Sequence, residues 1–274
     1  MSQPHTTHPD LVAPGTTIPD SAHQGKTAHQ GKKTHHGQAP LSQASLDASK
    51  FSCIQPQAVI FDLDGTLLDT APDIIAACNA TLTHFKLPPL SEALARTKVT
   101  AGMREMLKLG VPDVKAYQDA IEGEMRDYFA TYYTEHINVY THPFPGIIEL
   151  LQDLEKAQIK VAIVTNKYEH MAQELLQKYP FYEQLALILG CDSVTHSKPH
   201  PEPILKTLEH LQVQAPQAIY VGDHLNDMLA SNAAHTISAA ALWGYGGNEC
   251  GHPSSWHAQY LLPNVAALRA LCLP

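Results

Sequence analysis

The sequence lacks the closely spaced cysteines that build disulfide frameworks and zinc clusters. Five cysteines are spread over 274 residues, their number is odd, and none forms a Cys-x-x-Cys pair. Neither a small disulfide scaffold nor a zinc ribbon is indicated, because both need cysteines at short, regular spacing. This usage is typical of a reducing compartment, so we expect the protein to be cytoplasmic.

Long apolar runs and excess positive charge are also missing. The longest apolar stretches, such as residues 185–189, are far shorter than the about 20 residues that cross a bilayer, and the first residues show no basic segment followed by an apolar one. The formal net charge is -9 at pH 7, which argues against broad neutralisation of nucleic-acid phosphates. We expect no membrane and no nucleic-acid partner, and composition indicates no particular oligomeric state.

Aromatic residues are absent from the first fifty residues, which are rich in His, Gln, Gly, Thr and Pro. Such a segment buries too little apolar surface to offset the entropy of ordering, so residues 1–53 are predicted to be a disordered, low-complexity tail. Neutral imidazoles bind zinc, nickel or copper, so the tail could collect such ions weakly. A solvated extension without a site is the favoured interpretation. The histidines concerned are His5, His8, His23, His29, His35 and His36.

From residue 54 onward, apolar segments typical of buried strands alternate with segments of helical periodicity. The alternation predicts the α/β class, with a doubly wound, Rossmann-like parallel sheet. Three strands end at Asp62, Thr165 and Asp223, and ligands of such sheets bind beyond the carboxyl ends of the strands. The strand segments are 58–62, 161–166, 219–223 and, with weaker patterns, 185–189, 236–240 and 260–262; the helical segments are 146–157, 169–179, 202–211, 225–234 and 265–271.

A long stretch with helical periodicity separates the first strand from the second. Residues 72–85 and 113–136 each carry an apolar stripe at helical spacing, which predicts two paired helices. We therefore expect a helical cap domain over residues 72–137, inserted into a core domain made of residues 54–71 and 138–274. Such an insert can close over a site at the first strand. An insert that only adds stability is the alternative.

Two carboxylates, Asp62 and Asp64, follow the first strand and precede Gly65. A tight turn at that point brings both to one site, where one carboxylate can attack phosphorus while the other transfers protons to and from oxygen. A plain turn or a fragment of a calcium loop is the alternative for any Asp-x-Asp-Gly taken alone. The position directly after a buried strand favours the catalytic interpretation.

Four short motifs follow one another along the chain. They are Asp62-Leu-Asp64-Gly-Thr66-Leu-Leu-Asp69-Thr, Thr165-Asn166-Lys167, Ser197-Lys198-Pro199 and Gly222-Asp223-His-Leu-Asn-Asp227. With these motifs the sequence resembles, from about residue 54 on, the haloacid dehalogenase superfamily. Two later stretches, Trp243-Gly-Tyr245-Gly and His252-Pro-Ser-Ser-Trp256, look like segments of its phosphoglycolate phosphatase-like group, which includes N-acetylmuramic acid 6-phosphate phosphatases. The insert lies between the first and second motifs, as in members with a helical cap.

The resemblance implies a phosphoric monoester hydrolase with an aspartyl-phosphate intermediate. It implies Asp62 as the nucleophile and Asp64 as the general acid and base. It also implies that Asp62 and Asp223 bind the metal ion by side chain and Asp64 by its backbone carbonyl. Asp227 is expected to support the site through Lys198 or a water on the metal.

Physical chemistry points to the same roles. Negative charge spreads over the oxygens of a phosphoryl group in transit, so Lys198 and the hydroxyl of Thr165 are suited to stabilise it, with Asn166 as a further substrate-binding residue. Several carboxylates crowded beside a phosphate would repel it, so a hard divalent cation is needed, and Mg²⁺ is the predicted cofactor. Taken singly, a lysine before proline is usually a surface charge and a threonine at a strand end usually a cap.

The expected substrate is a small phosphorylated metabolite, with phosphoglycolate and N-acetylmuramic acid 6-phosphate as the candidates. Arg104 follows a glycine turn in the insert, and its guanidinium could hold a substrate carboxylate with two hydrogen bonds. An exposed helical arginine is the alternative. His224 follows the motif aspartate, and two roles stay open for it, one at the rim of the pocket and one in proton transfer.

Two other functions stay open from the sequence. A phosphomutase of the same superfamily shares the core chemistry and would act on a sugar phosphate, giving a product that retains the phosphate. A non-catalytic binding module that uses the histidine-rich tail would show no turnover, and the intact motifs argue against it.

Overall fold

The computed structural model describes residues 53–274. The predicted disordered tail and its six histidines lie outside the described residues, apart from Cys53. Within the described part of the chain, no helix is long and apolar enough to cross a membrane.

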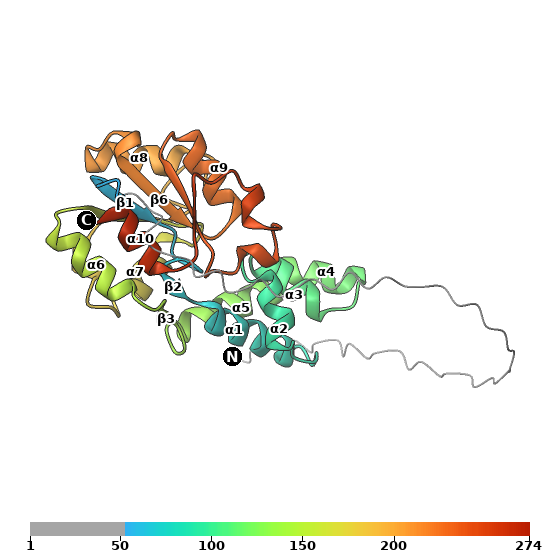
Figure 1. Cartoon of the computed structure of the whole chain (residues 1–274). Helices are drawn as coiled ribbons and strands as arrows, with labels where there is room; N and C mark the ends of the chain where they lie inside the picture. Colours follow the sequence, from blue (N-terminus) through green and yellow to red (C-terminus); the bar gives the residue numbers. More distant parts are fainter. Residues whose placement is uncertain (1–52) are drawn as a thin grey trace, which may run out of the picture. The chain divides into compact units, whose positions relative to one another are not determined.

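A parallel sheet forms the centre of the fold (Figure 1). It has six strands in the order β5-β4-β1-β6-β7-β8. Strand β1 lies between β4 and β6, with Val59 opposite both Val161 and Ile219. The doubly wound α/β class predicted from the sequence is confirmed. The strands are β1 (Ala58–Phe61), β4 (Lys160–Val164), β5 (Leu185–Leu189), β6 (Ala218–Gly222), β7 (Ile237–Ala241) and β8 (Tyr260–Leu262).

Helices cover both faces of this sheet, which explains why β1 is apolar at every position. Val59 and Phe61 pack in one hydrophobic cluster, while Ala58 and Ile60 pack in the other, as the two-residue period of a strand requires. Helices α6 (Ile147–Lys156), α7 (Glu169–Leu176) and α10 (Val265–Cys272) contribute to the first cluster. Helices α8 (Glu202–Leu211) and α9 (Leu225–Ala233) contribute to the second.

The segment between β1 and β4 is helical, as its periodicity predicted. Its elements are α1 (Ala71–His84), α2 (Glu92–Ala95), the 3-10 turn η2 (Arg96–Lys98), α3 (Met103–Gly110), α4 (Lys115–Glu122) and α5 (Glu124–Glu135). Helices α1 and α5 pack together, with the rings of His84 and Tyr128 stacked at 4.1 Å between centroids. The proposed boundaries of a cap domain at residues 72 and 137 stay a prediction.

The prediction of one continuous helix over residues 113–136 was wrong. Residues 113–136 form α4 and α5 in place of one long helix, and the break lies at Gly123. This glycine has φ -121° and ψ -107°, a conformation that is not helical. Glycine has no Cβ and loses more conformational freedom than other residues when it joins a helix, so a break there is inexpensive.

A short two-stranded sheet joins the helical segment to the parallel sheet. Strand β2 (Leu68–Asp69) pairs antiparallel with β3 (His142–Pro143). Beside it, the buried carboxylate of Asp73 at the start of α1 accepts hydrogen bonds from the backbone amides of Tyr140 and Thr141 and from the hydroxyl of Thr141. The outgoing and returning connections are therefore bound to each other.

Candidate active site

The loop after β1 places Asp62 and Asp64 at the carboxyl end of the central strand. Asp62 Oδ1 accepts a hydrogen bond from the backbone N–H of Leu63 at 2.7 Å. The chain then turns at Gly65, whose φ of +81° favours glycine. A Cβ at this position would lie 2.4 Å from Asp223 Oδ2, so the turn needs glycine for space as well.

Asp223 and Asp227 come from the end of β6 and the first turn of α9. Asp223 Oδ2 accepts hydrogen bonds from the backbone amides of Tyr245 and Gly246, at 2.8 and 3.2 Å, and its Oδ1 accepts one from the hydroxyl of Thr66. These three donors hold the carboxylate in place. One oxygen of each of Asp62, Asp223 and Asp227 lies within 4.8 Å of the others.

Lys198 is the positive charge at the centre of this group. Its Nζ lies 2.8 Å from Asp62 Oδ1 and 2.7 Å from Asp227 Oδ1, and it also donates to the carbonyl of Val164 and the hydroxyl of Tyr220. Burial of the ammonium lowers its pKa, but the charges of Asp227 and Asp62 outweigh burial and hold the pKa above its ordinary value. Lys198 is therefore a fixed cation.

A single lysine does not balance the buried carboxylates. Burial raises the pKa of Asp62 from 3.8 to about 7, although Lys198 opposes the rise. Burial, together with the charges of Asp62 and Asp227, raises the pKa of Asp223 from 3.8 to about 8. Two buried carboxylates that resist ionisation fit a site that a divalent cation completes, because the added charge would favour their ionised forms.

The hydrogen bonds and ion pairs that each carboxylate already makes determine which of them are suited to bind such an ion. Both oxygens of Asp227 are engaged, Oδ1 with Lys198 and Tyr220 and Oδ2 with the backbone amide of His224. Asp227 thus supports Lys198 and the start of α9. Asp62 and Asp223 are better suited to hold the ion, and the all-oxygen character of the group suits a hard cation.

Thr165 and Asn166 follow β4 and complete the same edge of the sheet. The Thr165 hydroxyl is buried and accepts a hydrogen bond from the backbone amide of Lys167, and the Asn166 amide donates to the backbone carbonyl of Lys198. Both residues line one cavity together with Asp62, Asp64 and Lys198. The structure therefore brings all the predicted core residues to one place.

The match to known protein families agrees with this geometry. Residues 59–241 match the family described as "Haloacid dehalogenase-like hydrolase". The chain belongs to this family. The superfamily predicted from the four motifs is therefore confirmed.

Two relatives of this haloacid dehalogenase-like hydrolase carry different names. A "Phosphoglycolate phosphatase" of Xanthomonas campestris pv. campestris is 40% identical over 210 residues, which cover 76% of this chain and 92% of that protein. An "N-acetylmuramic acid 6-phosphate phosphatase" of Pseudomonas aeruginosa is 36% identical over 227 residues, which cover 79% and 96%. A crystal structure of a predicted phosphoglycolate phosphatase from Haemophilus somnus has a TM-score of 0.67 at 25% identity, covering 78% of this chain and 96% of that chain.

Arg104 is the predicted site residue that the structure places elsewhere. Its guanidinium forms an ion pair with Glu122 at 2.9 Å, and about half of its side chain is exposed, at 54%. It is not among the residues that line the cavity, although Gly102 and Met103 are. The surface position matches the alternative of an exposed helical arginine, and a role in binding substrate stays a prediction without a contact that supports it.

Lys167 is a site residue of this hydrolase to which the sequence assigned no role. Its Nζ lies 3.2 Å from Asp64 Oδ1 and 3.1 Å from the hydroxyl of Tyr133 on α5. Burial lowers the pKa of Lys167, but Asp64 and Tyr133 more than offset it and hold the pKa above its ordinary value. Asp64 Oδ1 also accepts a hydrogen bond of 2.6 Å from Thr70. The sequence feature that could have indicated a role in the site is the position of Lys167 directly after the end of a predicted strand.

The cavity has a volume of about 450 Å³ and lies between the strand ends and the helical segment. Its side toward the sheet is charged and polar. Its side toward the helical segment is formed mostly by apolar groups, with Tyr133 and Thr100 as polar exceptions. These lining residues are Ile74, Val99, Thr100, Ala101, Gly102, Met103, Phe129, Ala130 and Tyr133.

His224 lies at the cavity but is engaged on both ring nitrogens. Its Nδ1 accepts a hydrogen bond from the backbone amide of Asn226, which caps α9, and its Nε2 lies 2.9 Å from the sulfur of Cys250. Burial lowers the pKa of His224. These contacts give the residue a structural role at the start of α9.

Proposed function

We propose that this protein is a Mg²⁺-dependent phosphatase that hydrolyses a small phosphate monoester through an aspartyl-phosphate on Asp62. The observation that carries the proposal is the convergence of Asp62, Asp64, Lys198 and Asp223 on one cavity. The names of the relatives support the same reaction class.

Magnesium would be held by the side chains of Asp62 and Asp223 and by the backbone carbonyl of Asp64. Bound there, Mg²⁺ supplies positive charge that offsets the negative charge of the phosphoryl oxygens and of the carboxylates. The same charge would lower the raised pKa values of Asp62 and Asp223.

In the first step, a carboxylate oxygen of Asp62 attacks phosphorus and the ester bond to the leaving oxygen breaks. Asp64 donates a proton to that oxygen, so the product leaves as a neutral alcohol. In the second step, water attacks the aspartyl-phosphate, Asp64 takes its proton, and Asp62 is restored as inorganic phosphate leaves. Thr70 and Lys167 hold Asp64 in position for both transfers.

Stabilisation of the transferring group falls to Lys198, Thr165 and Asn166. Lys198 is fixed by two carboxylates, so it needs no reorganisation when charge develops on the phosphoryl oxygens. The hydroxyl of Thr165 and the amide of Asn166 lie at the same strand end and can donate hydrogen bonds to those oxygens. The helical segment would act as a cap that encloses the group.

The substrate candidates are phosphoglycolate and N-acetylmuramic acid 6-phosphate, the substrates in the names of the relatives. The cavity favours the second. Its volume of about 450 Å³ lies within the roughly 300–1,000 Å³ of sites that take drug-sized ligands, and its apolar wall offers contacts that a two-carbon acid cannot use.

A direct test measures release of inorganic phosphate from both substrates by the full chain, with Mg²⁺ and after chelation. We expect Mg²⁺-dependent release and a higher kcat/KM for N-acetylmuramic acid 6-phosphate. A higher value for phosphoglycolate would overturn the substrate preference but not the reaction. A product that keeps its phosphate would indicate the phosphomutase, and absence of turnover of either ester would contradict the proposal.

A further inference from the structure

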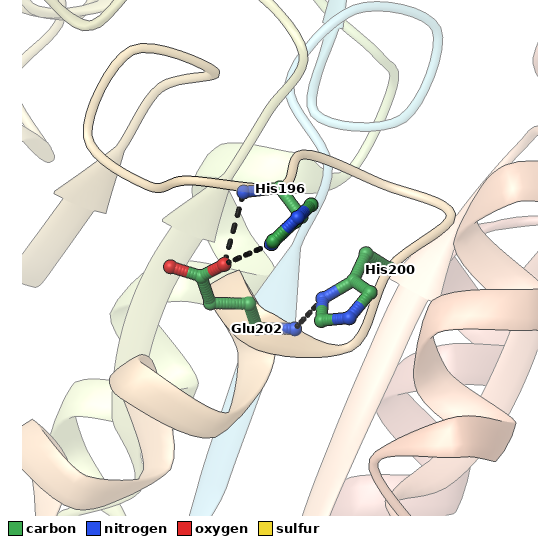
Figure 2. A group of neighbouring side chains, drawn as sticks. All are labelled: His196, His200 and Glu202. Carbon is green, nitrogen blue, oxygen red and sulfur yellow. Dashed lines mark hydrogen bonds and ion pairs between the residues drawn. The ribbon is translucent and has the colours of Figure 1, made fainter.

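Two histidines flank Lys198 in the loop between β5 and α8, away from the cavity. His196 and His200 are exposed, and both point toward Glu202, the first residue of α8 (Figure 2). One ligand atom from each of the three side chains lies within 4.8 Å of the others. The rings of the two histidines are 4.7 Å apart between centroids.

Hydrogen bonds hold the carboxylate of Glu202 in one orientation. Its Oε1 accepts from the backbone amide of Thr195 and from Lys206 Nζ, each at 2.9 Å. Its Oε2 accepts from the backbone amide of His196 at 2.9 Å and lies 3.1 Å from the Nδ1 of the same residue. The second contact of Oε2 is with His196 Nδ1, another member of the group, so an ion between these two atoms would replace that contact and leave the other hydrogen bonds of the carboxylate in place.

The histidine rings are held as well. His196 Nδ1 faces the carboxylate, and His200 Nδ1 accepts a hydrogen bond of 3.1 Å from the backbone amide of Glu202. A metal site with preoriented side chains loses less conformational entropy on binding than one with free side chains. Hydrogen bonds therefore organise part of the group.

The donor types and their spacing fit a transition metal. Two ligands of a tetrahedral zinc ion with bonds of about 2.1 Å lie roughly 3.4 Å apart, and His196 Nδ1 and Glu202 Oε2 are 3.1 Å apart. Neutral imidazole suits zinc, whereas magnesium strongly prefers oxygen. This site and the all-oxygen catalytic site would therefore select different ions.

We propose that His196, His200 and Glu202 form a second metal site that binds a zinc-class divalent ion, with water completing its coordination. The ion would join the loop that carries Lys198 to the first turn of α8. Since His196 and His200 lie two residues on either side of Lys198, the ion would stabilise the backbone that presents this lysine to the cavity. The expected consequence is a rise in thermal stability, not a new reaction.

The test compares zinc binding by the full chain and by its variants H196N, H200N and H196N/H200N. Excess Mg²⁺ is present throughout to fill the catalytic site. The tail histidines give the same background in every protein, so the difference between proteins reports this site alone. H210N is the matched control, because His210 is exposed on the same helix and lies outside the group.

Competition with a chromophoric chelator counts the zinc ions bound per chain, and thermal melts with and without zinc report the stabilisation. We expect the double variant to lose one zinc ion per chain and each single variant to bind that ion at least about tenfold more weakly. The double variant should lose the rise in Tm that zinc gives the parent and H210N, and each single variant should show a smaller rise at the same zinc concentration. Equal zinc counts and equal rises in Tm in all proteins would overturn the proposal. Glu202 is not varied, because it also holds two backbone amides.

Discussion

The two sides of the cavity are built by different physical means. On the side of the sheet, Asp62, Lys198 and Asp223 are each held by several charged or polar partners. On the side of the helical segment, Val99, Met103 and other apolar groups face the same space. Specific hydrogen bonds and ion pairs fix the groups of the polar side, whereas the apolar side is formed by contacts that have no such directional requirement.

This contrast assigns the chemical reaction to the polar side of the cavity and the choice of substrate to the apolar side. Charged, hydrogen-bonded groups fix distances and directions, which a reacting phosphoryl group requires. Apolar contacts discriminate by size and shape, and each contributes modestly. Changes on the polar side should therefore reduce turnover of every substrate, and changes on the apolar side should alter preference between substrates.

The largest effect is expected from Asp62→Asn. The amide cannot attack phosphorus and carries no charge for the cation, so kcat should fall by at least about 10⁴-fold for every substrate. Phosphate release under saturating substrate measures the loss. Asp153→Asn is the control, since Asp153 lies in exposed ion pairs with Lys156 and Arg269 and should keep full activity. Substantial activity in folded Asp62→Asn would remove Asp62 as the nucleophile.

Lys198→Met should have the next largest effect. It removes the fixed cation from the transferring group, so kcat should fall by about 10²- to 10³-fold. It also leaves Asp62 and Asp227 buried without their partner, which should cost about 3–5 kcal/mol in the free energy of unfolding. Steady-state kinetics and denaturant unfolding measure the two losses. Lys156→Met removes an exposed pair with Asp153 and should cost less than about 1 kcal/mol. Equal effects of the two variants would contradict the assigned role of Lys198.

A smaller and selective effect is expected from Met103→Ala on the apolar side. Loss of the side chain should raise KM by about tenfold for N-acetylmuramic acid 6-phosphate and leave phosphoglycolate nearly unchanged. KM values for both substrates test this. Leu94→Ala, a change of an exposed residue of the same helical segment, should alter neither value. An equal rise for both substrates would show that Met103 does not select between them.

The smallest effect concerns pH and the metal. Without the ion, Asp62 and Asp223 have raised pKa values, about 7 and about 8 against 3.8, so between about pH 4 and pH 8 the folded chain binds more protons than the unfolded chain. Stability should therefore fall as pH rises through this window. Thermal melts with a chelator should show Tm falling by several degrees, and excess Mg²⁺ should remove most of the slope. A slope that is identical with and without Mg²⁺ would contradict a cation at these carboxylates.

The polar side was predictable from the sequence because local rules determine it. Parallel strands bring their carboxyl ends to one edge, so residues at strand tips, such as Asp62, Thr165 and Asp223, had to converge. Lys198 does not directly follow a strand, so only the resemblance to the family predicted that it belongs to the site. The glycine at position 65 marked the turn that the first motif needs.

The helical segment was less predictable because its details depend on packing between distant residues. The contact of Tyr133 with Lys167 joins positions 34 residues apart, and no local pattern reveals it. The direction of Arg104 depends on which face of α3 packs inward, and its ion pair with Glu122 comes from a neighbouring helix. The break at Gly123 interrupts an apolar stripe that continues on both sides, so periodicity alone did not show it.

Asp73 has a mechanical consequence. A segment inserted into a domain is joined to it by two chain connections, and each connection could bend at a different point. Here the carboxylate of Asp73, at the start of α1, binds the outgoing connection to Tyr140 and Thr141 in the returning connection, so the two cannot bend independently at this point. Any movement of the helical segment relative to the sheet would therefore have to carry both connections together or break these hydrogen bonds.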